Sequence, residues 1–208
     1  VLGIAEGCKE DKEGWSSFLA YLKKRGLNCP ELFISDKCMG LLKSIDEYYP
    51  DAKWQRCCVH FYRNVFSVVP KGKMKEVAAM LKAIHAQEDK QAAKEKAVQI
   101  AEKLRSMKLS RAAEKVQTGI DQTFSYYDFP REHRRHIYTN NPLENIMKQI
   151  RRRTRVVGAF PDSNSAVMLA AARLRHIAGT KWGIRRYMNM GRLREMKQEK
   201  IHQMESIA

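Results

Sequence analysis

Two carboxylates lie where a protein could use them to hold a divalent cation. Asp36 follows the short apolar run at residues 32–35, which is typical of a β-strand, and Glu144 lies in the first turn of a predicted helix. Open α/β sheets place their chemistry at the carboxyl ends of strands. Because Mg²⁺ prefers oxygen ligands, the two side chains together suit a metal site that acts on a phosphodiester. Taken alone, Asp36 is explained more simply as the cap of the following helix.

The predicted helix that carries Glu144 also carries a block of cations. Asn141, Pro142 and Glu144 match a capping box, with Asn141 at the N-cap, so Glu144 also has a purely structural explanation. Residues at +4, +7, +8 and +11 from Glu144 share its helix face and are basic, whereas Leu143, Met147 and Ile150 fall on the other side. A carboxylate at the head of a basic stripe favours a functional role beside a phosphate backbone. The candidate DNA-binding residues are Lys148, Arg151, Arg152, Arg153 and Arg155.

The charge of the whole chain indicates a polyanionic partner. The 208 residues include 39 Lys and Arg against 23 Asp and Glu, for a net charge of +16, and the excess is concentrated towards the C-terminal half. A surplus of this size predicts binding to DNA or RNA more strongly than a role in solubility alone. The composition, 44% hydrophobic and 30% charged, is that of a globular protein. No apolar stretch approaches the ~20 residues that span a bilayer, so we expect no membrane partner.

Cysteine and histidine form one further candidate group. Cys57 and His60 have the spacing of half a zinc site, but the sequence lacks a second pair. A buried cysteine and a hydrogen-bonded histidine at the end of a strand are therefore the expected roles, and Asn141 with its neighbours is expected to support Glu144. An odd number of cysteines, two of them adjacent, favours a reducing cytosol over a disulfide framework. The five are Cys8, Cys29, Cys38, Cys57 and Cys58.

The hydrophobic pattern predicts an α/β fold with a helical insertion. Strands are expected at residues 1–6, 32–35 and 53–59, with helices between them, which is typical of a partly parallel sheet. In residues 63–126 the apolar residues recur at helical spacing, and no segment has a convincing strand pattern. The aromatic cluster Phe124, Tyr126, Tyr127 and Phe129 is expected in the core rather than as a base-stacking platform. The predicted segments are 1–62 (α/β core), 63–137 (helical insertion), 138–178 (helices carrying Glu144 and the basic stripe) and 179–208 (basic C-terminal tail).

Four motifs in order resemble one known family. The segments FISDKCMGL, WQRCCVHFYRN, FPREH and YTNNPLENIMKQIRRRTRVVGAFPD are similar to those of mutator-type transposases of bacterial insertion sequences, over nearly the whole chain. The resemblance implies an RNase H-like core with two Asp and one Glu, in which a helical insertion precedes the Glu. On this mapping Asp36 is the second Asp, Glu144 is the final Glu, and Cys57 and His60 form the family's C-x-x-H element.

The resemblance also implies an activity and its partners. We expect strand cleavage and strand transfer at insertion-sequence ends, with two Mg²⁺ (or Mn²⁺) ions ~3.5–4 Å apart held by the acidic residues. The expected partners are double-stranded DNA, as terminal inverted repeats and target DNA, and further copies of the protein in a homo-oligomer. The expected location is the cytoplasm, in association with the nucleoid.

Two departures from the family pattern qualify these expectations. The family's first Asp is expected on a strand upstream of Val1, so we expect this chain to be an N-terminally truncated fragment that binds DNA but cleaves poorly alone. Lys37 stands where a Gly commonly follows the second Asp. The alternatives are a non-catalytic basic nucleic-acid-binding domain, in which both carboxylates serve as caps, and a decayed remnant of a mobile element. A nuclease acting on RNA is a weaker alternative, because the sequence has no clear stacking motif.

Overall fold

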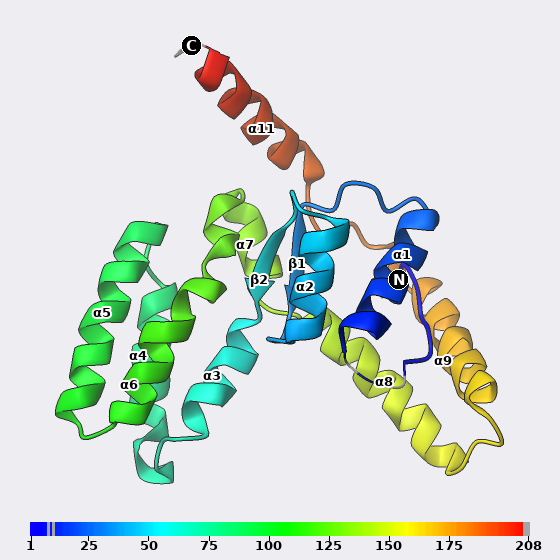
Figure 1. Ribbon diagram of the computed structural model, residues 1–208, viewed down its shortest axis with the longest axis horizontal. Coiled ribbons are helices and arrows are strands. Elements are labelled where there is room, and N and C mark those ends of the chain that lie inside the picture. Colours follow the sequence, from blue (N-terminus) through cyan, green and yellow to red (C-terminus); the bar gives the residue numbers. More distant parts are fainter. Residues whose placement is uncertain (8, 10, 206–208) are drawn as a thin grey trace. The chain divides into compact units, whose positions relative to one another are not determined.

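A computed structural model describes residues 1–7, 9 and 11–205 (Figure 1). The chain is mostly helical and includes a small parallel sheet of two strands, β1 (Leu32–Ser35) and β2 (Lys53–Arg56). It divides into two compact units. The first unit comprises Val1–Phe33, Lys37–Ala52 and Asn140–Tyr187, and the second comprises Ile34–Asp36, Lys53–Thr139 and Met188–Ala208.

In the first unit, α1 (Lys12–Lys24) packs against α2 (Met39–Tyr48) through small residues. A Cβ added at Gly40 would lie 2.6 Å from the backbone carbon of Asp11, so only glycine permits this approach. The buried Ser44 hydroxyl lies 3.1 Å from the Lys12 carbonyl and 2.9 Å from the Gly40 carbonyl, either of which it can donate to. The helix expected between residues 6 and 32 is confirmed as α1, and its start is fixed by Asp11, which accepts the Gly14 N–H at 3.0 Å.

The first unit also contains α8 (Asn141–Val157), α9 (Ser163–Ala178) and the short α10 (Lys181–Ile184). The buried residues Ile146, Leu174 and Ile177 join α8 to α9, and Ile4 packs against this cluster. The predicted strand at residues 1–6 is therefore wrong, because the described residues 1–7 contain no strand and place an apolar side chain on a helical pair instead. An apolar run this short shows no periodicity, so its sequence does not distinguish a strand from a segment that packs on helices without forming a strand.

The start of α8 differs by one residue from the predicted capping box. Asn140, not Asn141, is the N-cap, and the Glu144 N–H donates to the Asn140 carbonyl at 3.1 Å. Glu144 therefore lies one position beyond the third helical residue that a capping box requires, so the predicted box is wrong. The predicted apolar side of the helix is also partly wrong, because Ile146 is buried whereas Leu143 is 53% exposed and Met147 is 37% exposed.

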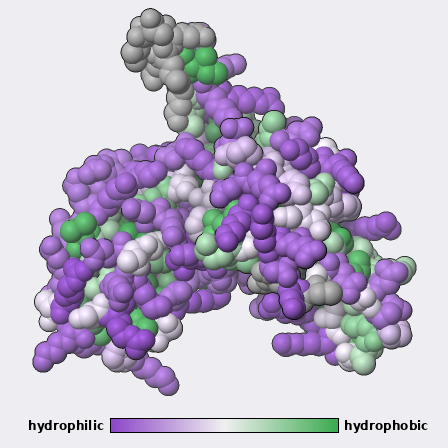
Figure 2. All heavy atoms as spheres, viewed as in Figure 1, coloured by the Kyte–Doolittle hydropathy of each residue, from purple (hydrophilic) through white to green (hydrophobic). Residues whose placement is uncertain are grey.

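The second unit is a helical bundle beside the sheet. Its core is built from helical repeats of apolar residues, such as Val77, Leu81 and Ile84, each 0% exposed. This confirms the predicted absence of strands between residues 63 and 126. Hydrophilic residues cover most of the surface in view over the bundle (Figure 2). The elements are α3 (Cys58–Phe66), η1 (Lys71–Lys73), α4 (Met74–His85), α5 (Lys90–Ser106), α6 (Ser110–Gly119), η2 (Ile120–Thr123), η3 (Ser125–Asp128), α7 (Arg131–Ile137) and α11 (Met190–Glu205).

The predicted strand at residues 53–59 is too long. β2 ends at Arg56, and α3 begins at Cys58 with Cys57 as its N-cap. Cys58, Phe61 and Val65 are buried at i, i+3 and i+7, so the apolar residues after Arg56 follow a helical period. No helix within the described residues is both long and apolar enough to cross a lipid bilayer.

Candidate catalytic site and nucleic-acid interface

Asp36 lies at the carboxyl end of β1, in the second unit, and is exposed. Arg56 ends the neighbouring strand and is only 6% exposed. Burial lowers the pKa of the Arg56 guanidinium, and the attraction of the Asp36 carboxylate partly offsets this. The guanidinium is held over the Phe61 ring, 5.2 Å from its centroid. Because the two strands are parallel, their carboxyl ends lie at the same edge of the sheet. The Asp36 carboxylate and the fixed Arg56 guanidinium are therefore presented together at that edge.

Cys57 supports this edge of the sheet. Its N–H donates to the Ser35 carbonyl at 2.8 Å, next to Asp36, and its side chain is fully buried. The expected buried cysteine is confirmed, although it lies at a helix start rather than in a strand. His60 lies on α3, with its Nε2 3.5 Å from Nη1 of Arg63. Throughout residues 1–7, 9 and 11–205, no group of three or more His, Cys, Asp or Glu side chains is placed to hold a metal ion.

Within the part of the chain that the structure describes, the cysteines form no disulfide. These are Cys29, Cys38, Cys57 and Cys58, whereas Cys8 lies outside the described residues. Burial raises the pKa of the Cys58 thiol well above its usual range, so Cys58 is neutral at pH 7. Cys58 therefore acts as a core residue and not as a nucleophile or thiolate ligand.

A buried amide, which the sequence analysis missed, anchors β2 to the helical part of the second unit. Gln55 is 0% exposed, and its Nε2 donates to the carbonyls of Arg56 and Thr123, both at 2.8 Å. Its Oε1 accepts the Tyr126 N–H at 2.9 Å. The hydrogen-bonding capacity of the amide is well used, so β2 is rigidly placed beside η2 and η3. The only sequence signal was a glutamine within a strand.

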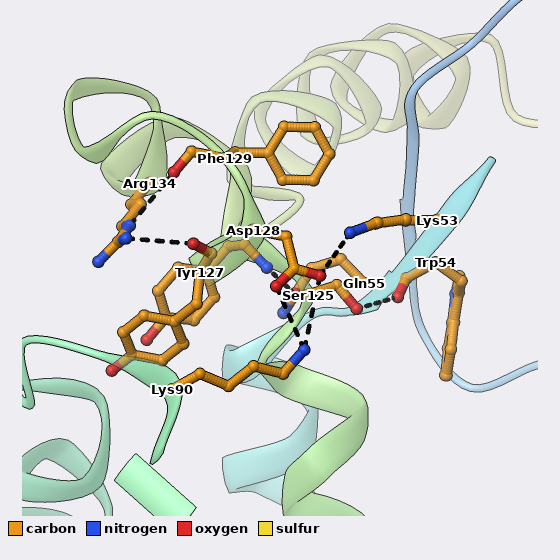
Figure 3. A network of polar contacts seen from close by, with 10 residues as sticks. Lys53, Trp54, Gln55, Lys90, Ser125, Tyr127, Asp128, Phe129 and Arg134 are labelled. Atoms are coloured by element: carbon orange, nitrogen blue, oxygen red, sulfur yellow. Dashed lines mark hydrogen bonds and ion pairs between the residues drawn. The ribbon is translucent and has the colours of Figure 1, made fainter. Parts of the chain in front are cut away.

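Asp128 forms a second anchor that sequence reasoning missed. Its carboxylate pairs with Lys53 at 2.6 Å and with Lys90 at 3.3 Å (Figure 3). Burial alone would raise the pKa of Asp128, but the two ammonium groups outweigh it and hold the pKa below its ordinary value. Asp128 is therefore a structural ion-pair partner that connects β2, α5 and η3.

The aromatic cluster belongs to the core, as predicted. Phe124 is 0% exposed, and Tyr126, Tyr127 and Phe129 are each below 10% exposed. Tyr126 and Tyr127 stack with ring centroids 4.3 Å apart. Arg134 caps this stack from α7, with its guanidinium 5.0 Å from the Tyr127 centroid. These rings pack the second unit, so none of these four is a free stacking surface.

Glu144 lies in the first unit, on the first turn of α8, and is partly buried. The predicted basic residues Lys148, Arg151, Arg152, Arg153 and Arg155 are all exposed. The basic face of α8 continues from Glu144 along one side of the helix. It consists of Lys148, Arg151, Arg152 and Arg155. The opposite side is fixed by Ile146 and by Gln149, whose Oε1 accepts from Nη2 of Arg173 on α9 at 2.7 Å. The helix thus presents a row of guanidinium groups that suits a phosphate backbone.

Asp36 and Glu144 belong to different compact units. The structure therefore brings Asp36 together with Arg56 and Cys57, and Glu144 together with the basic face of α8. The convergence of the two carboxylates stays a prediction.

Comparison with known proteins gives one consistent result. Residues 1–182 match the family model for "Transposase, Mutator family". The chain is 34% identical over 203 residues to the transposase for insertion sequence element ISRM5 of Rhizobium meliloti, which covers 98% of this chain and 51% of that protein. It is 35% identical to the transposase for IS1081 of Mycobacterium tuberculosis, covering 83% of this chain and 41% of that protein.

A third relative is similar over most of this chain. The transposase for IS256 in transposon Tn4001 of Staphylococcus aureus is 34% identical over 173 residues, covering 83% of this chain and 44% of that protein. The chain thus spans about half the length, or less, of these curated relatives.

Proposed function

Because the chain belongs to the Mutator family of transposases, we propose that it carries part of an RNase H-like catalytic core that cuts insertion-sequence ends and joins them to target DNA. The observation that carries this proposal is the placement of Asp36 at the carboxyl edge of a parallel sheet, within a chain that matches transposases over most of its length. In this proposal Asp36 and Glu144 are the second and third acidic residues of a DDE-type site.

The donor chemistry of these residues fits Mg²⁺ or Mn²⁺. Mg²⁺ keeps several waters and is commonly held by one or two carboxylates together with substrate phosphates, so an exposed Asp36 is a suitable ligand. Glu144 is the second proposed ligand. A pair of such ions, when bound, would activate an attacking oxygen and stabilise a leaving oxygen. The role of this chain is to hold the carboxylates on a strand end and a helix, while buried Cys57 fixes the backbone beside Asp36.

The basic face of α8 is proposed to bind the DNA backbone next to Glu144. Its exposed arginines lie on a helix whose other side is packed, so they are available for phosphate contacts. The proposed substrates are double-stranded terminal inverted repeats and target DNA, bound by a homo-oligomer that holds two ends. The proposed location of the protein is the nucleoid of the cell.

The proposal is tested by Mg²⁺-dependent strand cleavage of insertion-sequence end DNA. The substitutions Asp36→Asn and Glu144→Gln should be made in the protein as its full reading frame encodes it. Each keeps the shape of the side chain but removes the charge that binds the metal, so we expect cleavage to fall by on the order of a hundredfold or more. DNA affinity measured in EDTA should stay within about threefold, because the phosphate contacts are intact.

Matched controls separate a lost ligand from a general effect of charge. Asp46→Asn on α2 and Glu132→Gln on α7 change exposed carboxylates outside the proposed site and should leave cleavage unchanged. Unimpaired cleavage by both Asp36→Asn and Glu144→Gln would instead favour a non-catalytic DNA-binding domain.

A further inference from the structure

A hollow of about 520 Å³ lies in the second unit between the end of α4, η3 and α7. Its volume falls within the roughly 300–1,000 Å³ typical of small-molecule sites. Four basic residues and one acidic residue, Glu88, line it. The hollow is formed by residues of the second unit alone, and neither Asp36 nor the basic face of α8 contributes to it.

One of the four cations has a structural role. Arg134 donates from Nη1 to the Glu88 carbonyl at 2.9 Å and from Nη2 to the Tyr127 carbonyl at 3.1 Å. It therefore fixes the wall of the hollow. Lys82, Arg131 and Arg135 are exposed cations of the lining, and they give the rim its positive charge. Such a rim attracts an anion, most simply a phosphate group.

Three tyrosines line the hollow. Tyr126 and Tyr127 form its buried part, and Tyr138 stands edge-on to Tyr126 with centroids 6.2 Å apart. Tyr138 is 37% exposed, so its ring is the accessible one. Burial lowers the pKa of His85, which also lines the hollow, to about 4, so this imidazole is neutral at pH 7 and can only donate or accept hydrogen bonds.

Exposed cations and an accessible aromatic ring that line one hollow match the two parts of a nucleotide. We infer that this hollow binds one unpaired nucleotide of DNA, with its phosphate at Lys82 and Arg131 and its base against Tyr138. Stacking on a ring requires a base that is not covered by its neighbours in a duplex, so the site selects single-stranded DNA. That the polymer is DNA rests on the proposed transposase function. That the hollow suits a nucleotide rests only on the cations and the ring that line it.

Crosslinking locates the base directly. A single-stranded oligodeoxynucleotide that contains iododeoxyuridine should be irradiated with the full chain in EDTA and the crosslinked peptide identified by mass spectrometry. We expect the label on Tyr138 itself, assigned at the level of the single residue because a peptide that contains Tyr138 can extend into α8. Labelling confined to α8 would overturn the inference.

Matched variants measure the contribution of each part. Removing a stacking ring should weaken binding of a short oligodeoxythymidylate by about tenfold in Tyr138→Ala, measured by fluorescence anisotropy, whereas Tyr138→Phe should bind as the unsubstituted chain does. The pair Lys82→Gln and Arg131→Gln should weaken the same complex and reduce its salt dependence. Circular dichroism checks that each variant is folded.

Comparison with duplex DNA and with an abasic strand tests whether Tyr138 contacts an unpaired base. A duplex of the same length should bind Tyr138→Ala and the unsubstituted chain equally, and an abasic oligomer should be insensitive to Tyr138→Ala. Equal losses for duplex and single strand, or equal affinity for abasic and normal strands, would overturn the inference. Because the assay contains no metal and requires no cleavage, its outcome is independent of the Asp36→Asn test, and either proposal can fail without the other.

Discussion

At the scale of single residues, the buried amide of Gln55 is a clear structural anchor. It satisfies two carbonyls and one N–H, those of Arg56, Thr123 and Tyr126, away from water. In Gln55→Leu these groups stay buried without their partner, at a cost of about 1–3 kcal/mol each when no water replaces it. We expect the free energy of unfolding to fall by about 3 kcal/mol, measured by urea denaturation followed by circular dichroism.

An exposed glutamine provides the control. Gln91 on α5 donates from Nε2 to Oε1 of Glu95, within one turn of an exposed helix face. Gln91→Leu should change the free energy of unfolding by less than about 0.5 kcal/mol. A loss below about 1 kcal/mol in Gln55→Leu would mean that the anchor contributes little beyond its packing.

The residues that the sequence could and could not predict differ in the range of their contacts. Arg151 and Arg155 share one helix face by periodicity within a single segment, and both are exposed. Gln55 and Asp128 take their roles from partners more distant in sequence, 68 residues away for the Thr123 carbonyl and 75 residues away for Lys53. No local sequence pattern indicates such pairs, so they could be identified only from the structure.

At the scale of secondary-structure elements, α9 shows a start signal that is fully local. Asp162 is its N-cap, and its Oδ1 accepts the Ser165 N–H at 2.7 Å. Asp162→Ala removes this acceptor and the negative charge at the positive end of the helix dipole. We expect a loss of about 1 kcal/mol in the free energy of unfolding, measured by urea denaturation.

The neighbouring position gives a matched comparison for Asp162. Ser163→Ala changes an exposed residue inside the same first turn without removing the cap and should leave stability within about 0.5 kcal/mol of the unsubstituted chain. If the two variants lose the same free energy, the cap is not the cause.

Local boundary signals were only a partial guide to the elements, because the capping box expected at Asn141 is displaced by one residue from the observed N-cap of α8. The starts of α1 and α9 each carry an Asp cap. The apolar residues after Arg56 allowed either strand or helix, and burial at helical spacing decided for α3. For residues 1–6, packing of Ile4 against the α8–α9 cluster decided the outcome, and that contact is not visible in sequence.

At the scale of the whole molecule, the units are assembled from stretches far apart along the chain. The first unit joins α1 and α2 with α8 and α9, across the helical segment that forms most of the second unit. The sequence predicted that a helical block interrupts the chain, because periodicity changes near its start. It did not predict which stretches pack together, because those contacts depend on tertiary geometry.

The charge of the whole molecule, +16, raises the question of whether duplex DNA is attracted by overall charge or by one surface. Each phosphate contact that is lost should reduce the slope of log affinity against log salt by about 0.9. If the basic face of α8 makes the contacts, the pair Arg151→Gln and Arg155→Gln should lower this slope by about 2 in a fluorescence anisotropy titration.

A second pair of substitutions with the same loss of charge separates the two explanations. Lys75→Gln and Arg111→Gln change exposed residues on α4 and α6 of the second unit, outside both proposed binding surfaces. Counterion release depends on contacts rather than on net charge, so this pair should leave the salt slope nearly unchanged. Equal changes in slope for the two pairs would show that the DNA is held by a diffuse field, and α8 would then lose its assigned role as the phosphate-binding helix.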